Sequence, residues 1–248
     1  MSFKDKVVLV TGGSTGIGFA TAKQFANEGA KVFITGRRSA ALEAAANEIG
    51  KGVVGISGDT SRLSDLDALI DTIRKEAGKI DVVFANAGII DFAPIGEISE
   101  EQFDRLFSVN VKGLVFTVQK ALPLIPDGGS IILMSSTVAG KGLPANSVYS
   151  ATKAAIRNFA RVWATDLKSR NIRVNAISPG PIDTPGLSGL AADEAQAEQI
   201  KNYLASTVPL GRLGTPDEVG KALVFLASDD SSFVTGAELF VDGGAAQV

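Results

Sequence analysis

The stretch Thr11-Gly12-Gly13-Ser14-Thr15-Gly16-Ile17-Gly18 directly follows the apolar run Val7-Val8-Leu9-Val10. A short apolar run that ends at glycines and precedes an amphipathic segment at 19–28 predicts a buried strand, a tight turn and a helix that begins near Gly16. Glycines let the backbone approach phosphate oxygens because no Cβ stands in the way, and the first N–H groups of the helix point at the phosphate charge. The stretch therefore favours a site for a dinucleotide pyrophosphate over the alternative, a tight turn without a ligand.

The composition excludes several kinds of chemistry. The chain has 248 residues, is 45% hydrophobic and carries a net charge of −3, which gives no sign of attraction to nucleic acid or membrane. No run approaches the roughly 18 apolar residues of a membrane span, and the N-terminal apolar run is too short for a signal peptide, so we expect a cytoplasmic protein. Cysteine and histidine are absent, so acid–base chemistry must use Tyr, Lys, Asp or Glu, and no metal site is predicted.

Short apolar runs alternate with helical patterns along the chain. The runs at 7–10, 31–35, 53–58, 81–85, 130–135, 172–177 and 238–241 read as strands. Most are apolar on successive residues, as strands covered on both faces are. The segments that start at Ser99 and Thr215 each fit a capping box at the start of a helix. The pattern predicts one α/β domain over residues 1–248, a doubly wound, Rossmann-like parallel sheet of about seven strands with helices on both faces.

Residues 185–206 are the least regular part of this pattern. They are rich in Gly, Ala, Ser and acidic residues, and they follow the end of a predicted strand. We expect either a mobile substrate lid or an ordinary surface insertion.

Polar residues and glycines stand where several predicted strands end. Asp59 follows the third strand, Asn86-Ala87-Gly88 the fourth, Ser135-Ser136 the fifth and Ser178-Pro179-Gly180 the sixth. The carboxyl ends of parallel strands meet at one edge of the sheet, where ligands bind. Each of these residues alone suggests a turn, but their shared edge favours a functional site.

Tyr149 and Lys153 are one helical turn apart, so their side chains lie on one face of a helix. An ammonium group beside a phenol favours the phenolate, so we expect Lys153 to lower the pKa of Tyr149 from about 10. The alternative is a half-exposed pair without a role in catalysis.

Together these motifs resemble the short-chain dehydrogenase/reductase family, in its compact type, over nearly the whole chain. The family's Thr-Gly-x-x-x-Gly-x-Gly is similar to residues 11–18, its Asn-Ala-Gly to residues 86–88, and its Tyr-x-x-x-Lys to Tyr149 and Lys153. Its catalytic serine and asparagine correspond to Ser136 and Asn110. The resemblance implies a cofactor site made of Thr11, Gly12, Ser14, Thr15, Gly16, Ile17, Gly18, Gly36, Arg37, Arg38, Asp59, Thr60, Asn86, Ala87, Gly88, Tyr149, Lys153, Pro179, Gly180, Ile182 and Thr184.

The resemblance also implies a mechanism. Tyr149 would protonate a carbonyl oxygen as a hydride arrives, or deprotonate an alcohol in reverse. Lys153 would lower the pKa of Tyr149 and bind the nicotinamide ribose, while Ser136 would donate a hydrogen bond to the substrate oxygen. Asn110 would hold a water that links Lys153 to solvent. The intact set of four argues against a cofactor-binding sensor without catalysis.

The end of the second predicted strand, Thr35-Gly36-Arg37-Arg38, bears on the choice of cofactor. NAD binders place an acid here for the ribose 2′-hydroxyl, whereas the 2′-phosphate of NADP favours arginine. Gly36 stands where an acid would repel phosphate, Arg37 can pair with phosphate, and Arg38 can stack on adenine or add charge. We expect NADP(H); the alternative is a solvated arginine pair at a loop tip.

The predicted substrate site is mostly apolar, which suits a hydrophobic ketone or secondary alcohol. It is formed by Ser136, Leu143, Tyr149, Leu187 and Tyr203, with the loop at 89–95, Pro144 and the rest of the segment 185–203 beside them. The alternative substrate is a 3-oxoacyl group on a carrier protein. In such reductases basic residues before the fifth strand help to dock the acidic carrier.

Residues 124–129 contain no basic residue, which weakens the carrier-linked alternative, although Arg170 and Arg173 remain nearby. The helices around 102–122 and 149–167 are more apolar than one sheet face needs, and the tail at 233–248 ends in a strand. Together with the resemblance, these segments imply a homotetramer.

Overall fold

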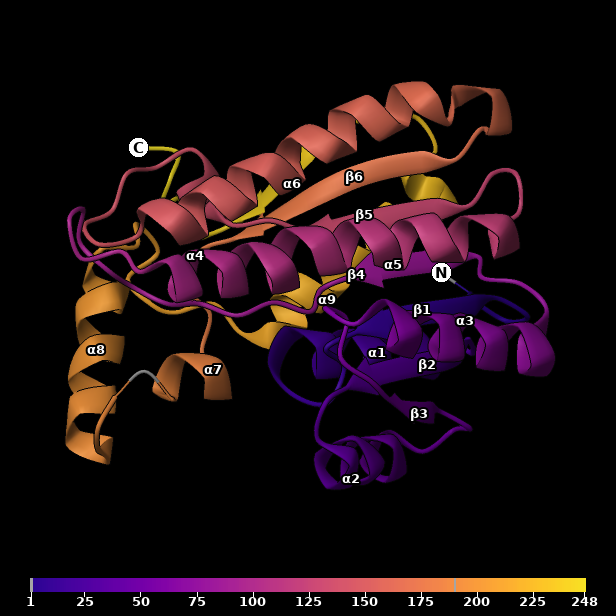
Figure 1. Ribbon diagram of the computed structural model, residues 1–248, viewed down its shortest axis with the longest axis horizontal. Helices are drawn as coiled ribbons and strands as arrows, with labels where there is room; N and C mark the ends of the chain where they lie inside the picture. Colours follow the sequence, from indigo (N-terminus) through magenta and orange to yellow (C-terminus); the bar gives the residue numbers. More distant parts are fainter. Residues whose placement is uncertain (1, 190) are drawn as a thin grey trace.

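The computed structural model describes residues 2–189 and 191–248. Its centre is a parallel sheet of seven strands in the order β3-β2-β1-β4-β5-β6-β7 (Figure 1). The strands are β1 (Val7–Thr11), β2 (Lys31–Gly36), β3 (Val54–Ser57), β4 (Val82–Ala85), β5 (Ser130–Met134), β6 (Arg173–Pro179) and β7 (Glu238–Val241). Each strand ends within two residues of its predicted bounds, and the predicted doubly wound parallel sheet is confirmed.

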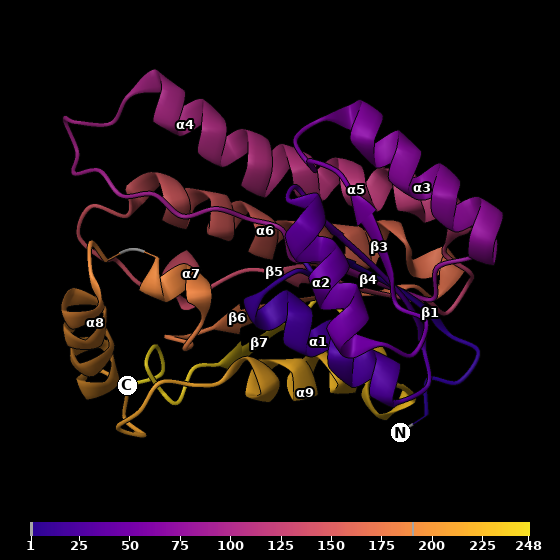
Figure 2. The same ribbon diagram turned by 90° about the horizontal axis from the view of Figure 1, so that it is seen from below.

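Helices cover both faces of the sheet (Figure 2). One face carries α1 (Gly16–Asn27), α2 (Ser39–Ile49) and α9 (Pro216–Ala227), and the other carries α3 (Leu63–Ala77), α5 (Gly113–Ala121) and α6 (Ser147–Asp166). The helix α4 (Glu100–Phe107) continues through a π-helical turn, η1 (Ser108–Lys112), into α5. No helix within residues 2–189 and 191–248 is both long and apolar enough to cross a membrane.

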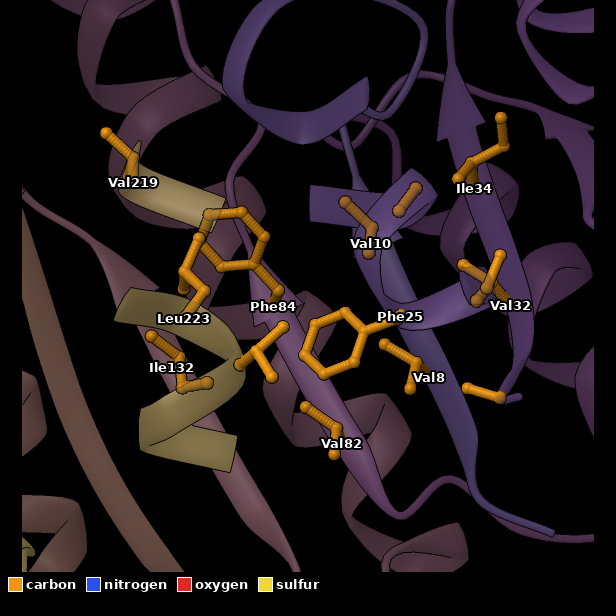
Figure 3. Packing of buried hydrophobic residues seen from close by; sticks show 14 of the residues in the cluster. Val8, Val10, Phe25, Val32, Ile34, Val82, Phe84, Ile132, Val219 and Leu223 are labelled. Carbon is orange, nitrogen blue, oxygen red and sulfur yellow. The ribbon is translucent and has the colours of Figure 1, made fainter. Parts of the chain in front are cut away.

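Strand β1 shows why the strands are apolar on successive residues. Val8 and Val10 pack with Phe25 of α1 beneath the sheet (Figure 3), whereas Val7 and Leu9 pack with the helices on the opposite face. Burying one such side chain stabilises the fold by roughly 1.5–3 kcal/mol. Both faces of each central strand therefore contribute to the core.

Strand β1 pairs with β2 on one side and with β4 on the other, so the chain crosses from one half of the sheet to the other at this point. The crossover helices diverge there and leave a crevice beyond the carboxyl ends of β1 and β4. The glycine-rich turn at 12–16 opens into this crevice.

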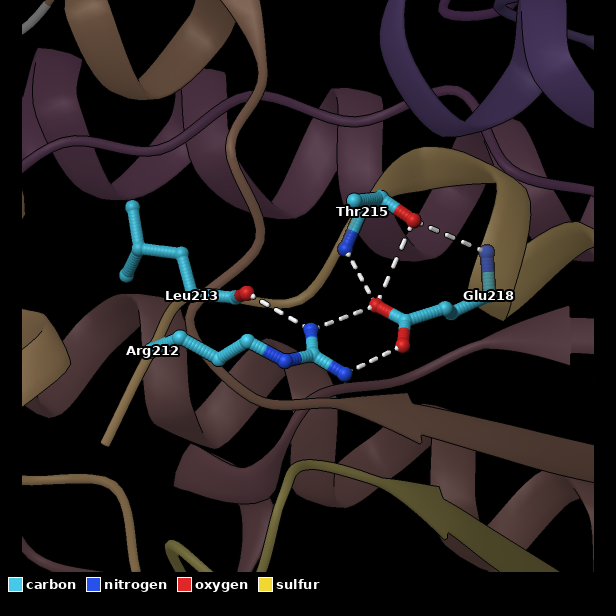
Figure 4. Close-up of polar contacts among 4 residues, drawn as sticks. All are labelled: Arg212, Leu213, Thr215 and Glu218. Atoms are coloured by element: carbon cyan, nitrogen blue, oxygen red, sulfur yellow. Dashed lines mark hydrogen bonds and ion pairs between the residues drawn. The ribbon is translucent and has the colours of Figure 1, made fainter. Parts of the chain in front are cut away.

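The two predicted capping boxes differ. At the start of α9, Glu218 and Thr215 bond each other's backbone N–H groups, and Arg212 binds the Glu218 carboxylate with two nitrogens (Figure 4). At the start of α4, Ser99 accepts a bond from the N–H of Gln102, but Gln102 Oε1 has no hydrogen-bond partner among the described residues. The prediction of a reciprocal box at Ser99 is therefore wrong, because a glutamine oxygen on this turn is buried away from the N-cap.

The segment at 185–206 is more regular than its sequence suggests. It contains the short helix α7 (Pro185–Ser188) and the helix α8 (Glu194–Ser206), which Asp193 caps by accepting a bond from the N–H of Gln196. None of the residues of α8 is buried. Both helices lie at one end of the molecule (Figures 1 and 2), and Lys201 forms an ion pair with Asp183 at 2.8 Å.

Candidate active site

One cleft of about 920 Å³ lies at the carboxyl edge of the sheet and brings together the predicted site residues. Every predicted cofactor-binding residue lines it except Thr11, and so do all five predicted substrate residues. Thr11 and Asn110 lie behind the wall of the cleft and are buried. The structure therefore gathers the two sets at one place, although they come from distant parts of the chain.

Thr11 and Asn86 fix the glycine turn to the end of β4. Thr11 Oγ1 accepts bonds from the N–H groups of Asn86 and Ala87, at 2.9 and 3.0 Å. Asn86 Nδ2 donates to the carbonyls of Thr11 and Gly12, at 2.8 and 3.2 Å. These four bonds hold the two strand ends at a fixed spacing, so the turn is shaped before any ligand arrives.

The glycines of this turn are required by close approach. A Cβ on Gly18 would lie 2.2 Å from the carbonyl oxygen of Gly12, and Gly12 itself has a φ of +66°. Thr15, at the N-cap of α1, makes no side-chain cap bond. The side chain of Thr15 therefore accepts no bond from the first backbone N–H groups of α1, which line the cleft. These N–H groups can bind the oxygens of a pyrophosphate.

The end of β2 combines an open glycine with two exposed arginines, Arg37 and Arg38. A Cβ on Gly36 would meet Ser14 Oγ at 3.4 Å, an ordinary contact. Just beyond the neighbouring strand β3, burial raises the pKa of Asp59, but hydrogen bonds from Ser61 and the charges of Arg37 and Arg62 outweigh it and lower the pKa overall. Asp59 is thus an anion whose pKa the charge of Arg37 helps to lower.

Ser136, Tyr149 and Lys153 meet on the other side of the cleft, at the end of β5 and on α6. The side chains of Ser136 and Tyr149 both line the cleft, and the Ser136 hydroxyl lies near enough to the Tyr149 phenol to lower its pKa. Lys153 Nζ donates to the carbonyl of Met134 at 2.9 Å and lies 5.5 Å from the centre of the Tyr149 ring. The predicted spacing of Tyr149 and Lys153 does place their side chains on one face of α6.

The expected effect of Lys153 on Tyr149 is not observed. Burial raises the pKa of Tyr149 to about 12, and the Ser136 hydroxyl opposes this only in part. Burial also lowers the pKa of Lys153 to about 8. The prediction of a lowered Tyr149 pKa is therefore wrong, because loss of solvent raises this pKa more than the Ser136 hydroxyl lowers it. Near neutral pH Tyr149 keeps its proton, as a general acid must.

Asn110 lies in the π-helical turn η1 and is completely buried. Its Oδ1 accepts a bond from the N–H of Ile89 at 2.8 Å, and its Nδ2 donates to the Ile89 carbonyl and to Thr152 Oγ1, at 2.9 and 3.2 Å. Thr152 in turn donates to the Tyr149 carbonyl at 2.6 Å. The side chain thus joins the loop after β4 to α6; the predicted water link to Lys153 stays a prediction.

Sequence reasoning missed part of the cleft wall. Leu204 lines the cleft just beyond the predicted segment 185–203, and its spacing of one helical turn from Ile200, which lies in that segment, marks one face of α8. That spacing could have identified the helix. Asn146, also on the wall, has no such signal. Pro144, which was expected beside the substrate, is not among the lining residues.

Comparison with known proteins gives consistent matches. A family model described as "Enoyl-(Acyl carrier protein) reductase" matches residues 12–246. The chain is 48% identical over 245 residues to an oxidoreductase of Sarocladium schorii, covering 98% of this chain and 96% of that protein. It is 40% identical over 249 residues to a 3-oxoacyl-[acyl-carrier-protein] reductase of Chlamydia trachomatis, covering 98% of each. The ligand-free structure of Thermoplasma acidophilum aldohexose dehydrogenase superposes with a TM-score of 0.89 at 33% identity, covering 99% of this chain and 96% of that one.

Proposed function

The chain belongs to the short-chain dehydrogenase/reductase family, and we propose that this oxidoreductase reduces a ketone reversibly to a secondary alcohol with NADP(H). One observation carries the proposal. Ser136 and Tyr149 line the same cleft as the glycine cradle, and the Ser136 hydroxyl lies close enough to the Tyr149 phenol to lower its pKa. Two hydroxyl donors at one point suit a single carbonyl oxygen, where negative charge develops during reduction.

The proposed mechanism assigns one role to each group. A bound nicotinamide cofactor supplies the hydride. Ser136 donates a hydrogen bond to the substrate oxygen, and Tyr149 delivers its proton to that oxygen. Since burial keeps Tyr149 protonated, the acid is ready before the substrate arrives. Lys153, whose Nζ lies near the ring, then stabilises the phenolate that forms.

The preference for NADP(H) rests on the end of β2. Gly36 leaves room and no negative charge beside the ribose, while Arg37 and Arg38 both line the cleft. A guanidinium can bind a phosphate through two parallel hydrogen bonds. The Asp59 carboxylate also attracts Arg37 electrostatically, so we expect a preference for NADP(H) and not an absolute requirement.

We propose that α7 and α8 form the substrate lid. One face of α8, with Ile200, Tyr203 and Leu204, lines the cleft, yet none of its residues is buried. A helix with so little buried surface can move at low cost.

We also propose assembly as a homotetramer. Large apolar side chains are exposed on α4, on α6 and on the tail: Phe103 at 45%, Val162 at 45% and Phe233 fully. Such patches favour burial between copies of the chain. Light scattering should show a tetramer at micromolar concentration, and a monomer would contradict this assignment.

Reduction of a carrier-linked 3-oxoacyl group is the second candidate, favoured by the Chlamydia trachomatis relative. The two arginines near residues 124–129 are already engaged. Arg170 binds Asp127 at 3.0 Å and the Leu122 carbonyl, and Arg173 binds the carbonyls of Leu226 and Ser228. Neither is free to hold an acidic carrier, so we place a small ketone first.

A substrate panel tests the proposed function. Small ketones and a carrier-linked 3-oxoacyl thioester are offered with NADPH and with NADH, and loss of the reduced cofactor is followed by absorbance. We expect reduction of at least one small ketone, faster with NADPH. Reduction of the carrier-linked substrate alone would favour the second candidate, and oxidation of neither cofactor with any substrate would contradict both.

A further inference from the structure

An exposed loop lies between Ser136 and the start of α6. Its residues 140–144, here called the 140–144 loop, are all exposed, and Leu143 lines the active-site cleft. In the part of the chain that the structure describes, the backbone groups of residues 141–144 make no hydrogen bond to another backbone group. A Cβ on Gly140 or on Gly142 would meet nothing within 4 Å. The backbone of the loop therefore does little by itself to hold Leu143 in place.

Lys141 is the one residue of the 140–144 loop with a polar side chain. Its Nζ donates a hydrogen bond to the carbonyl of Ala245 at 2.6 Å, although the two residues are 104 positions apart in the chain. A hydrogen bond from an ammonium group is stronger than one between neutral groups. Ala245 is itself buried. Lys141 thus ties the exposed loop to a buried point on a distant segment.

That segment, residues 242–246, forms a turn with its own internal hydrogen bonds, here called the C-terminal turn. The Asp242 carboxylate accepts bonds from the N–H groups of Gly244 and Ala246, both at 2.9 Å. The N–H of Ala245 donates to the Asp242 carbonyl at 3.1 Å. These three bonds set the direction of the Ala245 carbonyl, so the acceptor for Lys141 is shaped independently of the loop.

Close packing holds the C-terminal turn between the end of α8 and the end of β6. A Cβ on Gly243, which has a φ of +60°, would lie 2.6 Å from Val208 Cγ1, just after α8. On the other side, a Cβ on Gly180 would lie 2.8 Å from the Cα of Asp242. Segments packed this closely have little freedom to shift. The turn is therefore a fixed support for Lys141.

We propose that Lys141 is a positioning residue for the substrate. Its bond to the Ala245 carbonyl fixes the 140–144 loop, so that Leu143 packs against a part of the ketone that does not react. Lys141 is not among the residues that line the cleft, so it acts through Leu143. The inference rests on the proposed function, because it takes a ketone to occupy the cleft beside Ser136 and Tyr149.

Lys141→Met tests the proposal, because methionine keeps an unbranched apolar side chain and removes the ammonium group. Leu143 would contact the substrate equally before and during the reaction, so the variant should change KM and not kcat. With saturating NADPH, we expect KM to rise about fivefold and kcat to stay within about twofold. The probe is 2-heptanone or the best small ketone of the substrate panel. The Kd for NADPH, measured by fluorescence titration, should stay unchanged.

Lys141→Arg provides the rescue, since a guanidinium can also donate to a single carbonyl. It should restore the KM of the wild type. Lys75→Met is the matched control, because Lys75 is an exposed lysine on α3 that does not line the cleft. It should change neither KM nor kcat. An unchanged KM in Lys141→Met, a fall in kcat alone, or a failure of arginine to restore KM would overturn the proposal.

Gly243→Ala tests the same bond from the other end. The new Cβ must displace the C-terminal turn from Val208, so the Ala245 carbonyl moves while Lys141 is intact. KM should rise as in Lys141→Met, and the double variant should show little further change, since both substitutions remove one bond. Gly52→Ala is the control, because Gly52 has a φ of +74° and a Cβ there meets nothing within 4 Å. Additive effects of the two substitutions would contradict a shared bond.

Limited proteolysis separates this inference from the proposed function. Wild type and variants are digested briefly with subtilisin, and cuts within residues 140–144 are located by mass spectrometry. Cleavage there should be about fivefold faster in Lys141→Met than in the wild type or Lys141→Arg, with other cuts unchanged. This result would support the Lys141–Ala245 bond even if the wild type reduced no ketone, which would refute only the proposed function. Equal cleavage of the loop in the wild type and Lys141→Met would refute the inference.

Discussion

The polar side chains on the two sides of the cleft differ in how far they are hydrogen-bonded within the protein. On the cofactor side, which comprises the turn at 11–18 and the ends of β2 and β4, Thr11 and Asn86 use their side chains in four hydrogen bonds. On the reaction side, which comprises Ser136, Asn146, Tyr149 and Lys153, burial leaves groups with shifted pKa values or without partners. The cofactor side therefore offers a backbone that hydrogen bonds hold in place before the cofactor binds. The reaction side offers side chains that are shielded from water.

This difference teaches where each mutation should act. A change on the cofactor side should alter affinity or cofactor choice and leave the chemical step intact. A change on the reaction side should alter turnover or its dependence on pH.

The largest effect is expected from Tyr149→Phe. The variant loses the proton donor but keeps the ring and the packing of α6, so kcat should fall at least about a hundredfold. The affinity for NADPH, measured by fluorescence titration, should stay near that of the wild type. A variant that keeps most of its activity would show that Tyr149 is not the acid.

Gly18→Ala tests the rigidity of the cofactor side. The new Cβ would lie 2.2 Å from the Gly12 carbonyl, so the turn must shift. We expect a loss of roughly 1–3 kcal/mol in the free energy of unfolding, together with weaker NADPH binding. Gly140→Ala is the matched control, because a Cβ there meets nothing within 4 Å. Equal behaviour of the two variants, by urea denaturation and NADPH titration, would contradict a pre-formed cradle.

Gly36→Asp and Arg37→Leu test the choice of cofactor. The wild type should prefer NADPH by at least about tenfold in kcat/KM, since a charged hydrogen bond contributes roughly 1.5–3 kcal/mol. Gly36→Asp has room for its side chain and should reverse the preference by repelling the 2′-phosphate. Arg37→Leu should weaken NADPH and leave NADH nearly unchanged. Equal efficiency of both cofactors in the wild type would mean that the arginines are only a solvated loop tip.

The buried lysine predicts a rise of stability with pH. The pKa of Lys153 is about 8 in the folded protein and 10.5 for the free group, so between these values the unfolded chain binds more protons. The free energy of unfolding should therefore gain up to about 1.4 kcal/mol per pH unit from Lys153 across this window. Urea denaturation from pH 7.5 to pH 9.5 measures the gain, and Lys153→Met should abolish it. An equal rise in the variant would assign the effect to other groups.

Sequence reasoning reached the sheet and the glycine cradle because both depend on local patterns. Apolar runs bounded by glycines give the strands directly, and Gly12, Gly16 and Gly18 satisfy a requirement that only residues without a side chain meet. The raised pKa of Tyr149 could not be predicted this way, since it depends on burial by distant segments.

Other features also depend on tertiary contacts. The π-helical turn around Asn110 is set by bonds to Ile89 and Thr152, which lie on other elements. Asn146 looks like an ordinary N-cap in the sequence, and only the structure shows that it does not cap. The properties of the reaction side are therefore the ones that local sequence patterns predict least well.

Transfer of deuterium from the cofactor tests the central claim most directly. NADPH deuterated at its hydride-donating carbon, on one face and then on the other, is incubated with the wild type and a ketone that the enzyme reduces, and the alcohol product is analysed by mass spectrometry. The account predicts one deuterium on the carbinol carbon from one face only, and none on that carbon when unlabelled NADPH is used in heavy water. Deuterium that reaches the carbinol carbon from heavy water, or a carbinol carbon that gains none from either labelled cofactor, would contradict it.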